Sequence, residues 1–219
     1  MPALPENRIR DWRDCRAFIK ADFHSRSGRR PVSEFLRDPV VRFLLAMRLL
    51  EWAENCGVPA LFRLPLRIWF RRLSIRLGFT ISPHVFGPGV SLPHYGHIMV
   101  NGQACFGRNC RIHVGTVVAG TAAMMDRSEI PEFDAPIIGD NVYFAPGVKV
   151  SGPLRIADNI VIGANSVVTR SFTTAGVTLS GIPAKIVSVR GSEAMIVRGC
   201  DFVPELARPS REALAEAAE

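Results

Sequence analysis

The sequence has no paired cysteine motif, no long apolar run and no excess of acidic groups. Each absence removes a class of protein. The five cysteines, at positions 15, 56, 105, 110 and 200, are odd in number and include no C-x-x-C pair. Neither a disulfide framework nor a cysteine-based zinc site is therefore expected, and reduced thiols favour a cytoplasmic protein.

Apolar runs long enough to cross a membrane are also missing. The most apolar stretches, 43–50 and 60–70, are interrupted by Arg48 and by Arg63 and Arg67. A transmembrane helix needs roughly 20 apolar residues, so no membrane span is predicted. The first ten residues are polar, and no signal peptide is expected from them.

Basic residues exceed acidic ones, which gives a formal net charge of +7 and favours an anionic partner. Arg63, Arg67 and Arg71 are spaced by four residues and share one face of a predicted helix. Three interpretations are open: pairing with acidic helices, peripheral contact with anionic lipid, and nucleic-acid binding. No nucleic-acid partner is predicted, because no reading motif accompanies the charge.

Residues 1–78 are predicted to form an α-helical N-terminal domain. Apolar residues recur there at helical spacing, and proline and glycine mark the ends of the segments. The predicted helices are 7–24, a second with Asp38 as its cap and Pro39 as its first residue that ends at Gly57, and a third from Pro59 to Gly78 that is broken near Pro65.

From residue 79 the helical spacing gives way to a period of six. A strand alternates faces every two residues, so this period indicates short strands joined by tight corners, one on each face of a triangular prism. A β-sandwich with a turn about every 8–12 residues is the alternative. Apolar residues open the hexads, with a slip of two before the fourth: Phe86, Leu92, Ile98, Phe106, Ile112, Val118, Ile138, Phe144, Val150, Ile156, Ile162 and Val168.

The repeats predict a parallel β-helix domain over 79–190. Residues 119–136 interrupt the pattern and are expected to leave the prism as a loop that borders a site, because long loops in compact domains are usually functional. Residues 191–219 are predicted to be a less regular C-terminal tail.

The chain resembles the serine acetyltransferases, a branch of the hexapeptide-repeat acyltransferases with a left-handed β-helix. The resemblance covers about residues 78–188. It implies transfer of an acetyl group from acetyl-CoA to a hydroxyl group, in a homotrimer or a dimer of trimers with sites between adjacent prisms. The segments that carry it are SLPHYGHIMVN at 91–101, IGDNVYFAPGVKVSG at 138–152, IGANSVVTRSF at 162–172 and SGIPAKIVS at 180–188.

His94 matches the catalytic histidine of that family, and neutral imidazole is the usual base for a hydroxyl proton. The repeat arithmetic places His113 one coil further along, so it is a second catalytic candidate, and His97 is a substrate-binding one. The alternative for each is a corner histidine that only hydrogen-bonds its neighbours. A zinc site of the β-helix carbonic anhydrase kind is not expected, because that family's H-x-x-x-x-H pair is absent.

Small residues along a prism edge are expected to admit the pantetheine arm of CoA, and cations are expected to bind its phosphates. A solvated surface is the alternative for the two cationic residues among these candidates. The small candidates for binding acetyl-CoA are Ala145, Gly163 and Ala164. The resemblance adds Thr169, Arg170 and Lys185, which match positions that commonly contact CoA in that superfamily.

The acceptor is left open by departures from the serine acetyltransferase pattern. Pro93 stands where the family has an aspartate, and Asp134 and Ala135 stand in place of an Arg-His pair. Asp126 and Arg127 in the insertion are the substrate-binding candidates that replace them, with Arg127 binding a carboxylate.

Two further alternatives concern the reaction itself. A hydroxyl of a sugar, polysaccharide precursor or natural product is the alternative to L-serine as acceptor. A non-catalytic trimeric scaffold is the alternative to an enzyme. The sequence ends in Ala-Ala-Glu rather than the isoleucine by which serine acetyltransferases dock into cysteine synthase, so that complex is not predicted.

Overall fold

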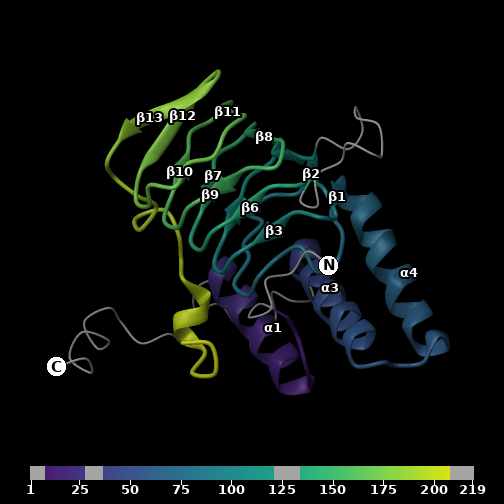
Figure 1. Cartoon of the computed structure of the whole chain (residues 1–219). Coiled ribbons are helices and arrows are strands. Elements are labelled where there is room, and N and C mark those ends of the chain that lie inside the picture. The colour runs from purple at the N-terminus through teal and green to yellow at the C-terminus, as the bar shows by residue number, and fades with distance from the viewer. Residues whose placement is uncertain (1–7, 28–36, 121–133, 208–219) are drawn as a thin grey trace.

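The computed structural model describes residues 8–27, 37–120 and 134–207. Helices pack against the first coil of a three-sided parallel β-helix (Figure 1). This confirms the predicted fold class. The helices are α1 (Trp12–Ser27), α3 (Pro39–Asn55) and α4 (Ala60–Leu77).

The ends of the helices follow from local chemistry. The Asp38 side chain accepts a hydrogen bond of 2.9 Å from the Val40 amide, and Pro39 occupies the first turn of α3. The predicted break at Pro65 is wrong, because α4 is continuous through it. Proline removes one backbone donor near the start of the helix. Burial of the inner residues Phe70 and Leu73 holds the helix together despite that loss.

Short strands form three sheets, one on each side of the prism, and their pairing is parallel except between β12 and β13. The sheet orders are β1-β2-β5-β8-β11, β13-β12-β10-β7-β4 and β3-β6-β9. The strands are β1 (Phe79–Thr80), β2 (Ile98–Val100), β3 (Cys105–Phe106), β4 (Arg111–Ile112), β5 (Val117–Ala119), β6 (Ile137–Ile138), β7 (Tyr143–Phe144), β8 (Lys149–Ser151), β9 (Arg155–Ile156), β10 (Val161–Ile162), β11 (Val167–Val168), β12 (Thr178–Gly181) and β13 (Ala184–Ser188).

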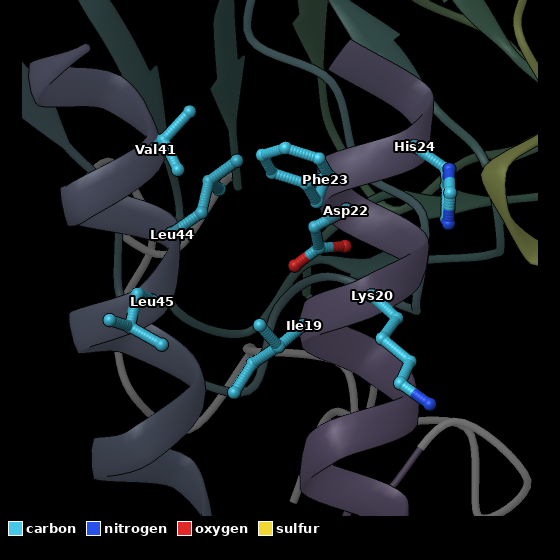
Figure 2. A pocket seen from close by; sticks show the side chains of 8 residues that line it. All are labelled: Ile19, Lys20, Asp22, Phe23, His24, Val41, Leu44 and Leu45. Atoms are coloured by element: carbon cyan, nitrogen blue, oxygen red, sulfur yellow. The ribbon is translucent and has the colours of Figure 1, made fainter. Parts of the chain in front are cut away.

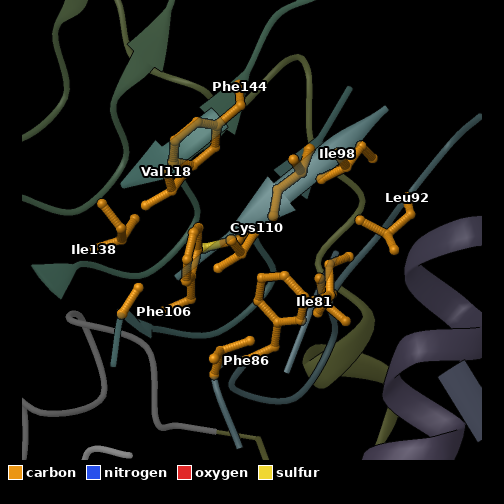
Figure 3. Close-up of a cluster of buried hydrophobic side chains, with 14 of the residues drawn as sticks. Ile81, Phe86, Leu92, Ile98, Phe106, Cys110, Val118, Ile138 and Phe144 are labelled. Carbon is orange, nitrogen blue, oxygen red and sulfur yellow. The ribbon is translucent and has the colours of Figure 1, made fainter. Parts of the chain in front are cut away.

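All of the residues predicted to open hexads are buried, the most exposed being Phe86 at 3%. Figure 3 shows several of them together in the prism interior. The Phe106 ring lies 4.9 Å from the Phe86 ring and 5.7 Å from the Phe144 ring, centroid to centroid. Phe86 and Phe106 are partners in register on successive coils, whereas Phe144 comes from another sheet, so the prism core packs side chains both along one side and across the interior.

The slip in the repeat lies elsewhere than predicted. Val100, rather than Ile98, pairs with Val118 one coil further on. Phe86 remains paired with Phe106. The additional residues therefore fall between Leu92 and Val100, at the corner that carries His94. Ile98 misled the prediction because it is also buried, as the partner of Phe79 in the first coil.

A buried arginine joins the helices to the prism. Arg48 of α3 is 1% exposed and forms ion pairs with Asp22 at 2.8 Å and Glu51 at 2.9 Å. It also donates to the carbonyl oxygens of Phe86 and Gly87 in the first coil, at 2.9 and 2.7 Å. One apolar core runs from the helices into the coils, so the helices cover the end of the prism.

The segment after residue 190 folds back onto α1, which the sequence did not predict. A short 3-10 helix, η3 (Gly199–Phe202), places the buried Cys200 against α1 and the first coil. A side chain at Gly199 would meet the Ala21 carbonyl oxygen at 2.0 Å, so this contact requires glycine. The last part of the predicted C-terminal tail, 208–219, lies outside the described residues.

The insertion begins and ends at neighbouring points of the prism. A Cβ atom at Gly120 would lie 2.8 Å from the Asp134 carbonyl oxygen, so the chain leaves and rejoins the coil at almost the same place. Residues 121–133 lie outside the described part. None of the helices described is long and apolar enough to cross a membrane.

Candidate functional site

His94 lies on the widened corner between Leu92 and Val100, where its side chain is exposed. Backbone contacts hold both ends of this corner. The Gly96 amide donates to the Leu77 carbonyl oxygen at 2.8 Å, and the His97 carbonyl oxygen accepts from the Gly115 amide at 2.7 Å. The Arg26 guanidinium of α1 donates to the carbonyl oxygen of Leu92. An exposed side chain is thus presented from a fixed backbone.

Gly96 permits the tight path of this corner. Its φ is +134°, in the region that favours glycine. A Cβ atom there would lie 2.7 Å from Cγ2 of Val114 on the next coil. The two coils can therefore approach closely next to His94 only because this residue has no side chain.

Three rings follow one another along the prism edge. The His94 and His113 ring centroids are 5.9 Å apart, and those of His113 and Tyr143 are 5.2 Å apart. The register of Ser91 with Arg111 sets His113 level with Pro93, one residue from His94. Tyr143 was not predicted; its only signal is its position directly before the inward Phe144, which turns it outward next to His113.

His113 is held as a neutral imidazole. Burial, the nearby Arg111 and His94 together lower the pKa of His113 to about 4. Arg111 Nε donates to His113 Nε2 at 3.4 Å, which leaves the ring proton on Nδ1. His113 is therefore a hydrogen-bond donor at neutral pH without carrying a charge.

We expect the imidazole of His113 to stay neutral down to about pH 4. The folded-state pKa of His113 lies below the unfolded value of 6.5, so between pH 6.5 and about pH 4 the unfolded chain binds more protons than the folded one. The stability of the fold therefore decreases as the pH falls through this range. Replacing Arg111→Gln should raise this pKa without restoring the ordinary value, since burial remains. NMR titration of the imidazole measures the pKa of His113 in the wild type and in the Arg111→Gln variant, with Arg155→Gln on another sheet as the control. Titration of wild-type His113 near pH 6.5 would contradict the assignment.

A pocket of about 410 Å³ opens beside His94. Both carboxylate oxygens of its Asp38 are engaged, one by the Val40 amide at 2.9 Å and the other by Arg26 Nε at 2.7 Å. Arg37 is exposed, and no carboxylate of the described residues pairs with it. The pocket therefore offers an uncommitted cation. Its lining residues are Arg26, Arg37, Asp38, Pro39, Pro93, His94 and Tyr95.

The predicted CoA-binding residues divide between two prism edges. Ala145 and Gly163 directly follow β7 and β10 and are level with His113, because Ile112, Phe144 and Ile162 are in register. Lys185 pairs with Ser180 at the end of the same sheet. Ala164 is exposed next to Gly163, whereas the exposed Thr169 and Arg170 follow β11, at the far side of the neighbouring sheet.

The packing of the β-helix itself, and not only a ligand, favours a small residue at Gly163. A Cβ atom there would lie 3.1 Å from Ser180 Oγ and 3.2 Å from the Leu179 carbonyl oxygen. Close stacking of the last two coils therefore already disfavours a larger residue, whether or not a ligand lies along this edge.

The remaining predicted residues are less informative. His97 is exposed on the same corner as His94, with no side-chain hydrogen bond to the residues described. Asp126 and Arg127 lie outside the described residues.

Within 8–27, 37–120 and 134–207, no three histidine, cysteine or acidic side chains gather as a metal site. None of the five cysteines, all of them among the described residues, forms a disulfide.

A second cavity, of about 270 Å³, lies between α1 and α3 and is mostly apolar (Figure 2). Ile19 and Phe23 of α1 face Val41 and Leu44 of α3 across it. Its one carboxylate, Asp22, is bound to Arg48 and to the backbone amides of Gly89 and Val90. The described residues that line this cavity are mainly apolar and its carboxylate is already bound, so the site by His94 is the stronger candidate.

Comparisons with known proteins agree with the repeats. Residues 135–170 match the model of the family described as bacterial transferase hexapeptide (six repeats). The chain is 28% identical over 175 residues to serine acetyltransferase of Synechococcus elongatus. The aligned residues make up 80% of this chain and 66% of that protein. It is 39% identical over 124 residues to serine acetyltransferase of Staphylococcus aureus strain Mu50, covering 56% of this chain and 52% of the relative.

Solved structures extend the likeness to the fold. Serine acetyltransferase from Brucella abortus superimposes with a TM-score of 0.58 at 25% identity, over 81% of this chain and 69% of that one. The chain spans only about half to two thirds of the length of the curated relatives it matches. By its repeats, its three-sheet prism and these relatives, the chain is similar to the hexapeptide-repeat transferases and, among them, to the serine acetyltransferases.

Proposed function

We propose that the protein transfers the acetyl group of acetyl-CoA to a hydroxyl group of a small acceptor, with L-serine as the first acceptor to test. The observation that carries the proposal is the position of His94. It is an exposed imidazole on a fixed corner, beside a charged pocket and at the end of an edge of small residues. A base, an acceptor pocket and a path for an acyl carrier thus meet at one place.

In this proposal His94 takes the proton of the acceptor hydroxyl as the oxygen attacks the thioester carbon. The resulting oxyanion needs a hydrogen-bond donor, and His113 Nδ1–H is one at neutral pH. When the carbon–sulfur bond breaks, the protonated His94 returns its proton to the leaving sulfur. The products are the O-acetyl ester and CoA thiol, and the base is regenerated.

The pantetheine arm of acetyl-CoA would follow the edge that carries Ala145 and Gly163 toward His113. Lys185 at the end of the same sheet would meet its phosphates. Arg170 lies on another edge, so it would serve the site of an adjacent protomer in a trimer. Solved serine acetyltransferases of the same fold include one in complex with CoA, at 22% identity and a TM-score of 0.56.

The acceptor pocket favours an anionic group. Arg37 is the uncommitted cation, whereas both oxygens of Asp38 already have partners and Pro93 supplies no carboxylate. L-serine offers a carboxylate to Arg37 but also an ammonium, which lacks a free acidic partner among the described residues of the pocket. Soybean serine acetyltransferase has been solved in complex with serine, at 23% identity and a TM-score of 0.61. A hydroxyl compound with a phosphate and no ammonium, such as a nucleotide sugar, is the second candidate.

The test is thiol release from acetyl-CoA with L-serine, homoserine and nucleotide sugars offered separately, and mass spectrometry of the products. We expect acceptor-dependent release and a singly acetylated ester. Acceleration by a nucleotide sugar alone would replace serine as the acceptor. If acetyl-CoA neither bound nor raised the melting temperature, the non-catalytic scaffold would be the better description.

A further inference from the structure

The outer face of α4 is an exposed apolar stripe bordered by arginines. Leu61, Leu64, Ile68 and Ile75 recur at intervals of three, four and seven residues and so lie along one side of the helix. The opposite side, with Phe70, Leu73 and Leu77, is buried against the rest of the protein. The exposed fractions are 75% for Leu61, 54% for Leu64, 43% for Ile68 and 71% for Ile75.

The five arginines of α4 include one that is paired and three that are exposed without a described partner; the fifth, Arg63, is half-buried. Arg67 forms an ion pair of 2.5 Å with Glu54 of α3, which confirms pairing with an acidic helix for that residue. Arg71, Arg72 and Arg76 are exposed, and no described carboxylate lies within ion-pair distance of them. At about 100° per residue, Arg71 borders the stripe on one side, and Arg72 and then Arg76 border it on the other.

Charge identifies what would cover this face. The sequence contains no aspartate or glutamate between Glu54 and Asp126, so neither α4 nor the segments next to it in the chain supply negative charge. In an isologous contact with α4 of a second copy, these arginines would face the same arginines of the other copy, and the like charges would repel each other. The occupant must therefore supply negative charge and accept apolar side chains along a nearly straight line.

We propose that α4 docks this protein onto the surface of an anionic lipid bilayer, with its leucines and isoleucines in the headgroup–acyl boundary and Arg71, Arg72 and Arg76 among the headgroups. A basic amphipathic helix lying in the plane of the interface combines these two interactions. Figure 1 shows α4 at the outside of the molecule, beyond α3. The proposal does not depend on acetyl transfer.

Vesicle co-sedimentation tests it with the full chain. We expect binding to vesicles of phosphatidylcholine mixed with phosphatidylglycerol, little binding to phosphatidylcholine alone, and loss of binding as salt rises. The double variant Leu64→Glu, Ile68→Glu and the triple variant Arg71→Gln, Arg72→Gln, Arg76→Gln should each weaken partition by at least about tenfold. Arg155→Gln, an exposed arginine of β9, is the matched control and should bind like wild type.

Circular dichroism and sedimentation velocity accompany each variant, so that loss of folding is not read as loss of binding. Failure of wild type to bind anionic vesicles, or equal binding by wild type and the folded triple variant, would overturn the proposal. A fall in the oligomeric mass of the Leu64→Glu, Ile68→Glu variant, without vesicle binding by wild type, would make α4 an interface between copies instead. Thiol release from acetyl-CoA without vesicles reports on the proposed function separately.

Discussion

Replacing His94→Ala should lower the acetyl-transfer rate by at least about a hundredfold, because a positioned general base contributes roughly 10²–10⁴-fold. Without the imidazole, the attacking hydroxyl would have to lose its proton to water. The quantity to measure is kcat/KM for acetyl-CoA, from thiol release at a saturating concentration of the acceptor. Because the side chain is exposed, the variant should keep the wild-type melting temperature and its affinity for acetyl-CoA.

Gln103→Ala, an exposed substitution on the following corner, is the matched control and should leave the rate unchanged. Added imidazole should restore part of the rate of the His94→Ala enzyme, which loss of folding would not allow. If His94→Ala retained the wild-type rate, the base would have to be sought in His113 or Tyr143, the next rings along the same edge.

Replacing Arg48→Met should lower the free energy of unfolding by about 3–5 kcal/mol, because it leaves the buried carboxylates of Asp22 and Glu51 without their cation. The carbonyl oxygens of Phe86 and Gly87 would lose a donor as well. Such a loss is a large share of the roughly 5–15 kcal/mol of a typical domain. Urea denaturation followed by circular dichroism measures it.

The triple variant Arg48→Met, Asp22→Asn, Glu51→Gln removes the stranded charges together and should recover most of the stability. An amide at position 22 keeps an oxygen for the Gly89 and Val90 amides, which donate to the carboxylate at 2.7 and 3.0 Å. Arg155→Gln, on the exposed surface, should change stability by less than about 0.5 kcal/mol. A loss below about 1 kcal/mol in the single variant would mean that water reaches this network.

The interior of the prism was predictable because its rule is local. Ile138, Phe144 and Val150 point inward because each is the second residue of a short strand between tight corners, and the pleat decides the direction of a side chain within two residues. The cap of α3 was predictable for the same reason, because Asp38 binds an amide only two positions away.

The register of the first coil was not predictable. Ile98 and Val100 are both buried and lie two residues apart, so either satisfies the apolar pattern. Only the pairing of Val100 with Val118 decides between them, and that pairing brings together strands from separate coils. The two additional residues consequently widen the corner at His94, where the proposed chemistry takes place.

The sequence alone was enough for the repeat and the buried side of each strand, since these depend on neighbours along the chain. The choice of His94 as the base stays a prediction, made from likeness to a family. The tertiary structure decided the rest. In the folded chain Arg37 and Asp38 of the helical part lie beside His94, and both carboxylate oxygens of Asp38 accept hydrogen bonds. The segment at Cys200 packs on α1. These contacts join residues distant in sequence, and no local periodicity encodes which of them meet once the helices close the end of the prism.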